Sequence, residues 1–354
     1  MMSRTLCIIV LICIFLALSG CGTPYTPIEP NQAVDEGNIL RDIQGGKGLS
    51  LIAFSRRMGE DPTANGELFV ITPNSLFEVQ LTFNPGDDRH PAFSPNGRSI
   101  AFVSNRFSGA PWGSHDVFRY TPWGGVTQIT DEAWQWDSLA VDYGAGFILA
   151  ARLNTLIGAP FDVVTVTAYD PWGYWSKHIP TGHGASYAPN LNRASKAMVF
   201  AARPAGNTYF GSMDIYILYR GETTAHQLTS FGKDPDNMVF STNPAFDFKG
   251  NRVVFQTTLW DGNTEIAYVK LDASIPMPYG PEHVTRVTNN PASDLAPSFS
   301  PDGDWIAIAT NRDGNFEIYK VWDPNSSGPP PFNPAVRLTN TTEDESDPDW
   351  SYYY

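Results

Sequence analysis

Cysteine is almost absent from this chain of 354 residues. Its three cysteines, Cys7, Cys13 and Cys21, all lie within the first 21 positions. No disulfide can therefore join segments of the remaining chain, and no cysteine cluster can hold a metal there. The six histidines show no His-x-x-x-His spacing either. The sequence thus predicts neither a metal site nor a resident cofactor.

Positive charge is also scarce. The chain has 23 Lys and Arg against 37 Asp and Glu, which gives a net charge of −14. Such a surface repels phosphate groups, which excludes nucleic acid as a partner and makes an anionic membrane surface a poor one. A partner protein with a basic patch, or a divalent cation, is the expected complement.

Long hydrophobic runs are limited to one, from Leu6 to Leu18, which follows the basic residue Arg4. The run is too short to span a membrane comfortably and has the form of an export signal. It ends in Leu-Ser-Gly-Cys at positions 18–21, which resembles the bacterial lipobox. In that family the signal is removed before the cysteine, whose thiol and amine become acylated. The resemblance predicts a lipoprotein signal peptide over residues 1–20 and lipidation of Cys21.

The segment after the cysteine predicts a flexible tether. Residues 21–47 are rich in Pro, Gly and polar residues and show no regular apolar pattern. Gly22, rather than Asp, follows the cysteine. By resemblance to enterobacterial sorting rules, this favours the outer membrane, with the protein facing the periplasm.

Apolar runs of helical period are rare, whereas Gly (30) and Pro (29) are abundant. This combination favours strands joined by tight turns. The stretches 90–106, 243–259 and 296–312 share one frame, and the chain repeats it six times at a period of roughly 50 residues. Each unit has four β segments, beginning with Pro-x-Phe-Ser and a Pro-Asn/Asp-Gly turn. Such sheets cannot bury both faces alone, so the copies must pack against one another.

These units resemble the WD40-like PD40 repeat of the TolB family. The resemblance implies an all-β fold, a six-bladed β-propeller of four-stranded antiparallel blades over residues 48–354. The first unit lacks its own Pro-x-Phe-Ser strand, while 347–351, "DPDWS", is an orphan copy at the other end. The C-terminal strand should therefore complete blade one and close the ring. TolB has an α/β domain before its propeller, whereas a tether precedes the blades here.

Arginines recur after the second strand of five units, and acidic residues recur before the first strand of four; blade five, with Leu259 and Ser241 at these places, lacks both. Both positions lie at the same end of a blade, so Arg–carboxylate latches are predicted, with ligand binding as the alternative. In blade one the arginine is Arg57 or its neighbour Arg56. The predicted latch residues are Arg57, Arg106, Arg152, Arg312, Asp88, Asp137, Asp294 and Glu345.

Two surfaces are predicted as possible partner sites. The loops before the first strands carry most of the acidic charge of that end, although a solvated acidic surface explains them equally. Their candidate residues are Asp131, Glu132, Trp134, Trp136, His183, Glu343 and Asp344. At the other end, turn aromatics form a second candidate, with packing on their own blades as the alternative. They are Trp123, Trp172, Tyr174 and Trp175.

The sequence shows no catalytic constellation. Asn311, Asp313, Asn315 and Glu317 have calcium-like spacing but lie in a repeated turn, so a bound Ca²⁺ is not favoured. We therefore predict a monomeric, membrane-tethered envelope protein whose propeller binds other proteins without catalysis. One alternative is a glycan-active lyase or hydrolase that uses channel residues such as His183. The other is a passive structural lipoprotein.

Overall fold

The computed structural model describes residues 50–59, 65–107, 115–131, 136–144, 147–154, 164–169, 171, 176–179, 186–192, 196–203, 211–231, 238–260, 263–326 and 334–351. For some strand residues of blades three and four it describes the backbone alone. Its regular elements are 24 strands and one short 3-10 turn, Pro281–His283. Within the described residues, no helix has the length and apolar character to cross a membrane.

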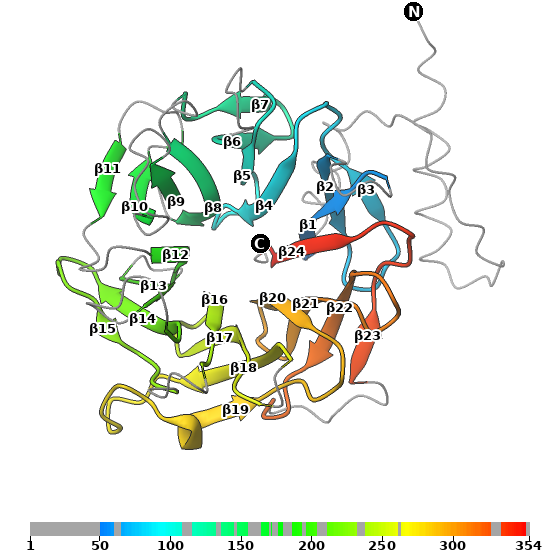
Figure 1. The fold of residues 1–354 in the computed structure, drawn as a ribbon. Coiled ribbons are helices and arrows are strands. Elements are labelled where there is room, and N and C mark those ends of the chain that lie inside the picture. The colour runs from blue at the N-terminus through cyan, green and yellow to red at the C-terminus, as the bar shows by residue number, and fades with distance from the viewer. Residues whose placement is uncertain are drawn as a thin grey trace, which may run out of the picture.

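Six four-stranded antiparallel sheets surround a central axis, as Figure 1 shows. This confirms the predicted six-bladed propeller. Blade one contains β24 (Glu345–Trp350), β1 (Ile52–Arg57), β2 (Gly66–Ile71) and β3 (Glu78–Gln80). Blade two contains β4 (Asp88–Phe93), β5 (Ile100–Ser104), β6 (Asp116–Thr121) and β7 (Gly125–Gln128). Blade three contains β8 (Trp136–Gly144), β9 (Phe147–Asn154), β10 (Val164–Tyr169) and β11 (Ser176–Ile179). Blade four contains β12 (Ser186–Leu191), β13 (Ala197–Ala202), β14 (Asp214–Tyr219) and β15 (His226–Gln227). Blade five contains β16 (Ser241–Phe246), β17 (Arg252–Thr257), β18 (Glu265–Lys270) and β19 (Val284–Arg286). Blade six contains β20 (Asp294–Phe299), β21 (Trp305–Thr310), β22 (Glu317–Trp322) and β23 (Ala335–Arg337).

The C-terminal strand closes the ring as predicted. β24 pairs antiparallel with β1, with Trp350 opposite Ile52, and begins at Glu345, two residues before the predicted start. The closure continues past the strand, because the Ser351 backbone N–H donates to the Leu51 carbonyl at 2.8 Å. The Leu51 N–H in turn donates to the Ser351 hydroxyl oxygen at 2.7 Å. The ring is therefore locked by hydrogen bonds between the two ends of the propeller sequence.

The meander gives the ring two faces. We call the upper face the one with the loops before each innermost strand and after each second strand. The lower face has the turns between strands one and two and between strands three and four. Ile52 lies opposite Ile71 and Arg57 opposite Gly66, so β1 runs from the lower to the upper face. Ser50, the first described residue, therefore lies at the lower face.

The hydrophobic core lies between neighbouring blades. Leu68 of blade one packs in one cluster with Phe102 and Phe118 of blade two, and all three are fully buried. Each such side chain contributes about 1.5–3 kcal/mol when removed from water. At the closing seam, Ile52 of blade one packs with Ile318 of blade six. Because each sheet is apolar on both faces, only the closed ring buries all of them.

Four innermost strands also contact the next blade, each through a residue at the equivalent place in its strand. There a side-chain oxygen accepts a backbone N–H of the neighbouring innermost strand. The pairs are Asp349 with Phe93 (2.6 Å), Asp142 with Leu191 (2.7 Å), Asn190 with Phe246 (2.9 Å) and Ser298 with Trp350 (3.0 Å). Burial raises the pKa of Asp349 to about 7 and that of Asp142 to about 6.

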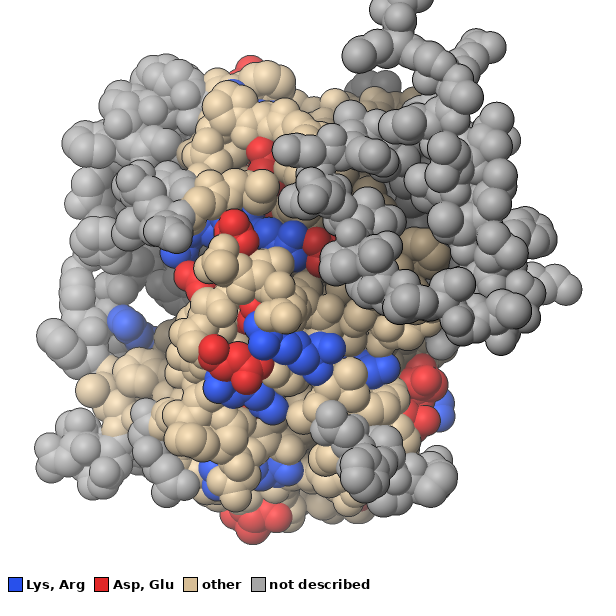
Figure 2. All heavy atoms as spheres, turned by 90° about the vertical axis from the view of Figure 1, so that its right-hand side faces the viewer, with Lys and Arg blue, Asp and Glu red and all other residues tan. Residues whose placement is uncertain are grey.

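On the side formed by blades one and six, basic and acidic side chains lie beside one another, as Figure 2 shows. Arg337 of β23, for example, binds Glu317 at 2.6 Å and Asp313 at 3.2 Å. This side of the ring therefore has no large area of one charge among the residues that the structure describes.

Candidate functional site on the upper face

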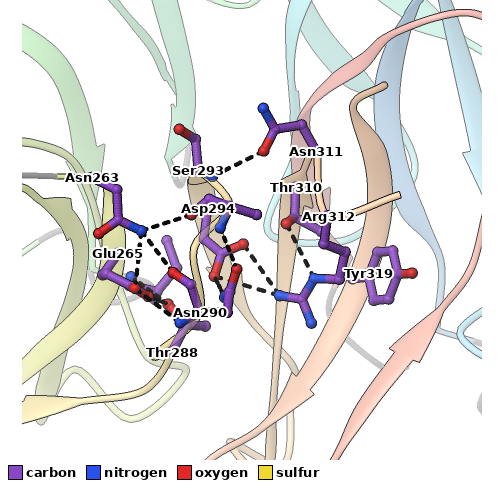
Figure 3. Close-up of polar contacts among 12 residues, drawn as sticks. Asn263, Glu265, Thr288, Asn290, Ser293, Asp294, Thr310, Asn311, Arg312 and Tyr319 are labelled. Atoms are coloured by element: carbon purple, nitrogen blue, oxygen red, sulfur yellow. Dashed lines mark hydrogen bonds and ion pairs between the residues drawn. The ribbon is translucent and has the colours of Figure 1, made fainter. Parts of the chain in front are cut away.

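A buried polar network joins blades five and six at the upper face (Figure 3). Arg312 Nη2 lies 3.2 Å from Asp294 Oδ1, and the Arg312 guanidinium carbon lies 4.7 Å above the Tyr319 ring. The Asn290 side-chain amide donates to Asp294 at 2.6 Å, while its backbone N–H donates to Glu265 at 3.1 Å. Both carboxylates are fully buried. One asparagine thus connects two buried acids, and each acid also contacts an arginine, since Arg286 Nη2 lies 3.1 Å from Glu265 Oε1.

The same arrangement joins blades one and two. Arg106 Nη2 lies 2.6 Å from Asp88 Oδ2. The Asn84 side chain donates to Asp88 at 2.8 Å, and its backbone N–H donates to Glu67 at 2.7 Å. The two Arg–Asp pairs that the repeat spacing brought together are therefore in contact, and their role as latches stays a prediction.

At the closing seam the buried partner of Glu345 is Arg56, not Arg57. Arg56 Nε lies 2.7 Å from Glu345 Oε1, and Arg56 Nη1 lies 2.6 Å from Glu78. Arg57, the last residue of β1, instead contacts Asp344 at 3.2 Å, and both of these side chains are partly exposed. Side chains alternate along a strand, so only one of two consecutive arginines can point into the seam.

The pKa of Glu345 is raised to about 8. Burial is the largest cause, the Arg56 charge opposes it, and the nearby Glu317 adds to it. Glu317, which Arg337 contacts at 2.6 Å, has a lowered pKa despite its own burial. The pKa values of these two buried carboxyls are therefore shifted in opposite directions at the same seam.

The remaining blades differ. Arg152 is buried and donates to the Tyr169 hydroxyl, with its guanidinium 5.5 Å from that ring. Its predicted partner Asp137 lies in β8, where the structure describes the backbone alone. Blade five was predicted to lack both latch residues, and there Ser241 and Thr257 share a hydroxyl–hydroxyl hydrogen bond of 3.0 Å.

A second set of buried acids was missed from the sequence. A buried acid lies at the start of the third strand in five blades, as its first residue or, in blade one, its second: Glu67, Asp116, Asp214, Glu265 and Glu317. In each, the next backbone N–H donates to the hydroxyl of a threonine after the fourth strand, at 2.8–3.0 Å. Burial raises the pKa of Glu67 and of Asp214 to about 6. The signal was visible in segments such as "ELFVIT" and "DIYILY", each of which opens with an acid.

The innermost strands open toward the channel at bulges. Five residues with positive φ each precede a proline and interrupt the pairing with the second strand: His90, Ala188, Asn243, Ala296 and Asp347. A bulge leaves one residue unpaired and turns its side chain out of the regular alternation. Here His90, Asn243 and Asp347 line a cavity as a result.

This cavity forms the channel mouth on the upper face. Its volume is about 560 Å³, and blades one, two, five and six supply its wall. Besides the three bulge residues, Arg57 and Phe316 line it. Volumes of this size accommodate small ligands or several amino-acid side chains.

Ion pairs surround the mouth, and three of them involve a loop or bulge residue. They are Arg57 with Asp344 (3.2 Å), Arg89 with Asp87, and His90 with Asp347 (3.2 Å). Burial would raise the pKa of Asp347, but the contact with His90 outweighs it and leaves that pKa below its usual range. The cavity wall therefore contains ion pairs, and a charged partner can replace one member of a pair with its own charged group.

Large apolar side chains are exposed around the same face. Phe83 and Phe107 are 59% and 68% exposed, and both follow strands of blades one and two. Met58 and Phe240 are also exposed at this face. Exposed phenylalanines beside a polar cavity are typical of protein-binding surfaces.

The structure places only part of the predicted partner surfaces. Asp131 is exposed, and Glu343 and Asp344 are half-buried at the rim. The Asp344 carboxylate accepts the Phe316 backbone N–H at 2.9 Å, which fixes the loop. Trp136 begins β8, without a described side chain.

Other predicted residues lie outside the described residues. They are Cys21, Glu132, Trp134, His183, Trp172, Tyr174 and Trp175. Of the predicted aromatic patch, Trp123 alone is described, and its side chain is 67% exposed on the lower face. Of the spaced polar residues 311–317, Asn311 accepts the Ser293 N–H, whereas Asp313 and Glu317 both contact Arg337. Among the described residues, no three His, Cys, Asp or Glu side chains converge on a possible metal position.

Solved structures share this fold. TolB from Acinetobacter baumannii matches with a TM-score of 0.66 and 17% identity, over 86% of this chain and 67% of that one. A putative TolB from Agrobacterium tumefaciens matches with a TM-score of 0.58 and 13% identity, over 87% of this chain and 100% of that one. Hydrazine synthase from Kuenenia stuttgartiensis matches with a TM-score of 0.66 and 13% identity, over 93% of this chain and 50% of that one. No protein-family pattern and no curated protein sequence matches.

At these identities the similarity concerns the fold. It confirms that the chain has a TolB-like six-bladed propeller, as the repeat predicted. Because the same architecture occurs in an enzyme, the fold does not by itself decide between binding and catalysis.

Proposed function

We propose that this chain is a non-catalytic, protein-binding propeller of the bacterial envelope, with its partner bound at the channel mouth of the upper face. One observation carries the proposal, namely the cavity of about 560 Å³ on the same face as the exposed side chains of Phe83 and Phe107. A partner with an apolar anchor and basic flanking residues would fill the cavity and pair with its acidic wall.

The test is affinity capture of partners from a detergent-solubilised envelope with the full-length protein as bait. We expect one or a few stoichiometric proteins, which a Phe83→Ser variant should lose. Leu76→Ser is the matched control, because Leu76 is 55% exposed on the lower face. Capture of no stoichiometric partner, or equal loss with both variants, contradicts the proposal.

The membrane attachment is a separate part of the proposal. The Leu-Ser-Gly-Cys motif at 18–21 supports acylation of Cys21, and residues 21–47 would serve as the tether. We propose that the propeller faces the periplasm from the outer membrane. Mass spectrometry of the protein from a bacterial envelope should find an N-terminal diacylglyceryl cysteine at position 21. A mature chain that begins elsewhere, or carries no acyl group, contradicts this part alone.

A further inference from the structure

We propose that the lower face of the propeller is a docking surface for anionic phospholipids, and lies against the membrane that holds the anchor. The inference rests on the proposed lipidation of Cys21 for its orientation, but the surface itself consists of described residues. Its features are an array of exposed aromatic and apolar turn residues, a group of basic residues among them, and the place where the tether joins the ring.

The first feature is the set of side chains at the lower turns. Among the described residues, blades one, two, four, five and six bring a Trp, Tyr, Leu or Met side chain to this face. They are Leu76 in blade one, Trp123 in blade two, Tyr219 in blade four, Met277 in blade five, and the half-buried Trp305 and Trp322 in blade six. Trp123 is the most exposed of them, at 67%. Trp and Tyr are the residues that favour the boundary between lipid headgroups and acyl chains.

Basic residues accompany these tips. Arg220 follows Tyr219, and its backbone N–H donates to the Lys196 carbonyl at 2.8 Å, so two exposed cations lie together in blade four. Lys249 lies in the adjoining turn of blade five, where Gly250 packs against Asn192 of blade four. Lys270, at the lower end of β18, is also exposed. Blades four and five therefore present four exposed cations on one continuous part of the face.

The acids of this area are largely engaged with neighbours. Glu222 contacts His226 at 2.9 Å, and Glu282 contacts His283 at 3.4 Å. Asp272 accepts hydrogen bonds from the backbone N–H and the hydroxyl of Ser274, at 2.8 and 2.7 Å. Four exposed cations against these three exposed acids leave the area with a net charge of +1. It differs from the upper face, where buried acids predominate.

In blade six a lysine lies beside a pair of tryptophans. Lys320 Nζ lies 4.6 Å from the centre of the Trp305 ring, and the Trp305 and Trp322 rings meet edge to face at 5.1 Å. Burial lowers the pKa of Lys320, and the charge of the exposed Asp302 in the same blade opposes that effect. A cation among aromatic rings that reach the surface is suited to the headgroup region. Arg98, exposed in the turn between strands one and two of blade two, adds a cation to the lower face of the blade that carries Trp123.

The third feature is the position of the tether. β1 begins at the lower face, and the Trp350 indole N–H donates to the Ser50 hydroxyl there. The proposed tether, residues 21–47, therefore joins the ring on the face that carries these cations. Anchoring would then bring the lower face to the membrane and direct the acidic upper face toward a partner. The net charge of −14 disfavours anionic membranes for the whole molecule, but not for this face.

The experiment uses the full-length protein purified from bacterial envelopes and reconstituted into vesicles. One set contains phosphatidylcholine alone, and the other contains phosphatidylcholine mixed with phosphatidylglycerol. A fraction of the phosphatidylcholine carries brominated acyl chains, which quench tryptophan at the membrane boundary. We expect quenching with phosphatidylglycerol that declines as salt is added. A Trp123→Phe variant should lack most of the salt-dependent component.

Charge variants separate this surface from simple tethering. Lys196→Glu/Lys249→Glu should lower the quenching about twofold or more, because each site changes from attraction to repulsion. Arg57→Glu/Arg89→Glu, on the upper face, is the matched control and should keep it. Both control sites are exposed. Absence of quenching in an acylated, vesicle-bound protein overturns the proposal, as does an equal effect of the two double variants.

Two further outcomes are decided by the same samples. If mass spectrometry finds no acyl group on Cys21, the anchoring proposal fails. Binding of the same protein from solution to phosphatidylglycerol vesicles then still decides the face, by presence or absence of the salt-dependent quenching. If iodide reaches Trp123 in pure-lipid vesicles but not in native envelope vesicles, a protein covers the lower face and the lipid proposal is overturned.

Discussion

Burial determines how much each arginine of the upper face contributes to stability. Arg106 has a 10% exposed side chain and neutralises Asp88, which is fully buried, whereas Arg57 and Asp344 are 44% and 37% exposed. Arg106→Met should lower the free energy of unfolding by about 3–5 kcal/mol, because it leaves a buried carboxylate without a cation. Arg57→Met should cost about 0–1 kcal/mol. Urea unfolding at constant pH measures both values.

A double variant separates the two causes of that loss. Asp88→Leu/Arg106→Met removes the buried carboxylate together with the arginine that neutralises it. The free energy of unfolding should therefore return most of the way to the wild-type value. If Arg57→Met costs as much as Arg106→Met, burial is not the determining factor and the latch interpretation is wrong.

Glu345 should make the closing seam sensitive to pH. Its pKa is raised from 4.5 to about 8, chiefly by burial. Between these values the folded protein holds a proton that the unfolded chain has released, so this group's contribution is fully present below about pH 4.5 and is lost as the pH rises toward 8. Glu345→Gln should therefore flatten the fall in the free energy of unfolding between pH 5 and 8.

The measurement is urea unfolding at several pH values across that window. Glu343→Gln, in the same loop but outside the buried seam, is the control and should keep the wild-type slope. A Glu345→Gln protein whose stability still falls as steeply as that of the wild type would show that another group controls the pH dependence.

Residue contacts were predictable where the repeat fixed the frame, although the latch role of these residues stays a prediction. Asp88 with Arg106, and Asp294 with Arg312, occupy equivalent places in two complete copies, so their spacing brought them together. Blade one takes its first strand from the far end of the chain, which left Arg56 and Arg57 indistinguishable. The third-strand acids escaped notice because their threonine partners follow at separations from 14 to 23 residues. Because the loops between these residues differ in length, no fixed sequence spacing indicates the acid–threonine contact, although the contact itself recurs from blade to blade.

At the scale of elements, β24 is the piece on which the ring depends. It pairs with β1, and its Trp350 packs against Ile52 and Ile318 across the seam. A chain that ends at residue 344 should expose the edge of β1 and leave Arg56 without Glu345. We expect it to lose its near-ultraviolet circular dichroism and to self-associate in size-exclusion chromatography with light scattering.

Addition of the missing strand in trans should reverse this change. A synthetic peptide of residues 342–354 can add to the free edge through backbone hydrogen bonds, and should restore the near-ultraviolet signal. A peptide of scrambled sequence is the control. A truncated chain that stays monomeric with an unchanged signal would show that the closing strand is dispensable.

The strands were predictable because alternation and turn residues recur in every copy, and the orphan "DPDWS" segment indicated closure. The bulges were not. His90, Asn243 and Asp347 adopt positive φ before a proline, a conformation that none of these residue types prefers over extended backbone in that position. Curvature of the innermost strands around the channel imposes it. The channel cavity, which depends on those bulges, could therefore not be derived from the sequence.

For the whole molecule, closure should make unfolding a single cooperative event. Open repeat arrays have approximately additive stabilities and can lose terminal units first. Here the hydrophobic clusters link neighbouring blades, and β24 joins blade one to the last part of the chain.

The 10 tryptophans are distributed along the sequence, so their fluorescence samples several blades. We expect urea transitions followed by tryptophan fluorescence and by far-ultraviolet circular dichroism to coincide, with one midpoint and one slope. The truncated chain ending at residue 344 is the comparison, because an opened ring should unfold over a broader range. Separate transitions in the intact protein would mean that the blades unfold as independent units despite the closing strand.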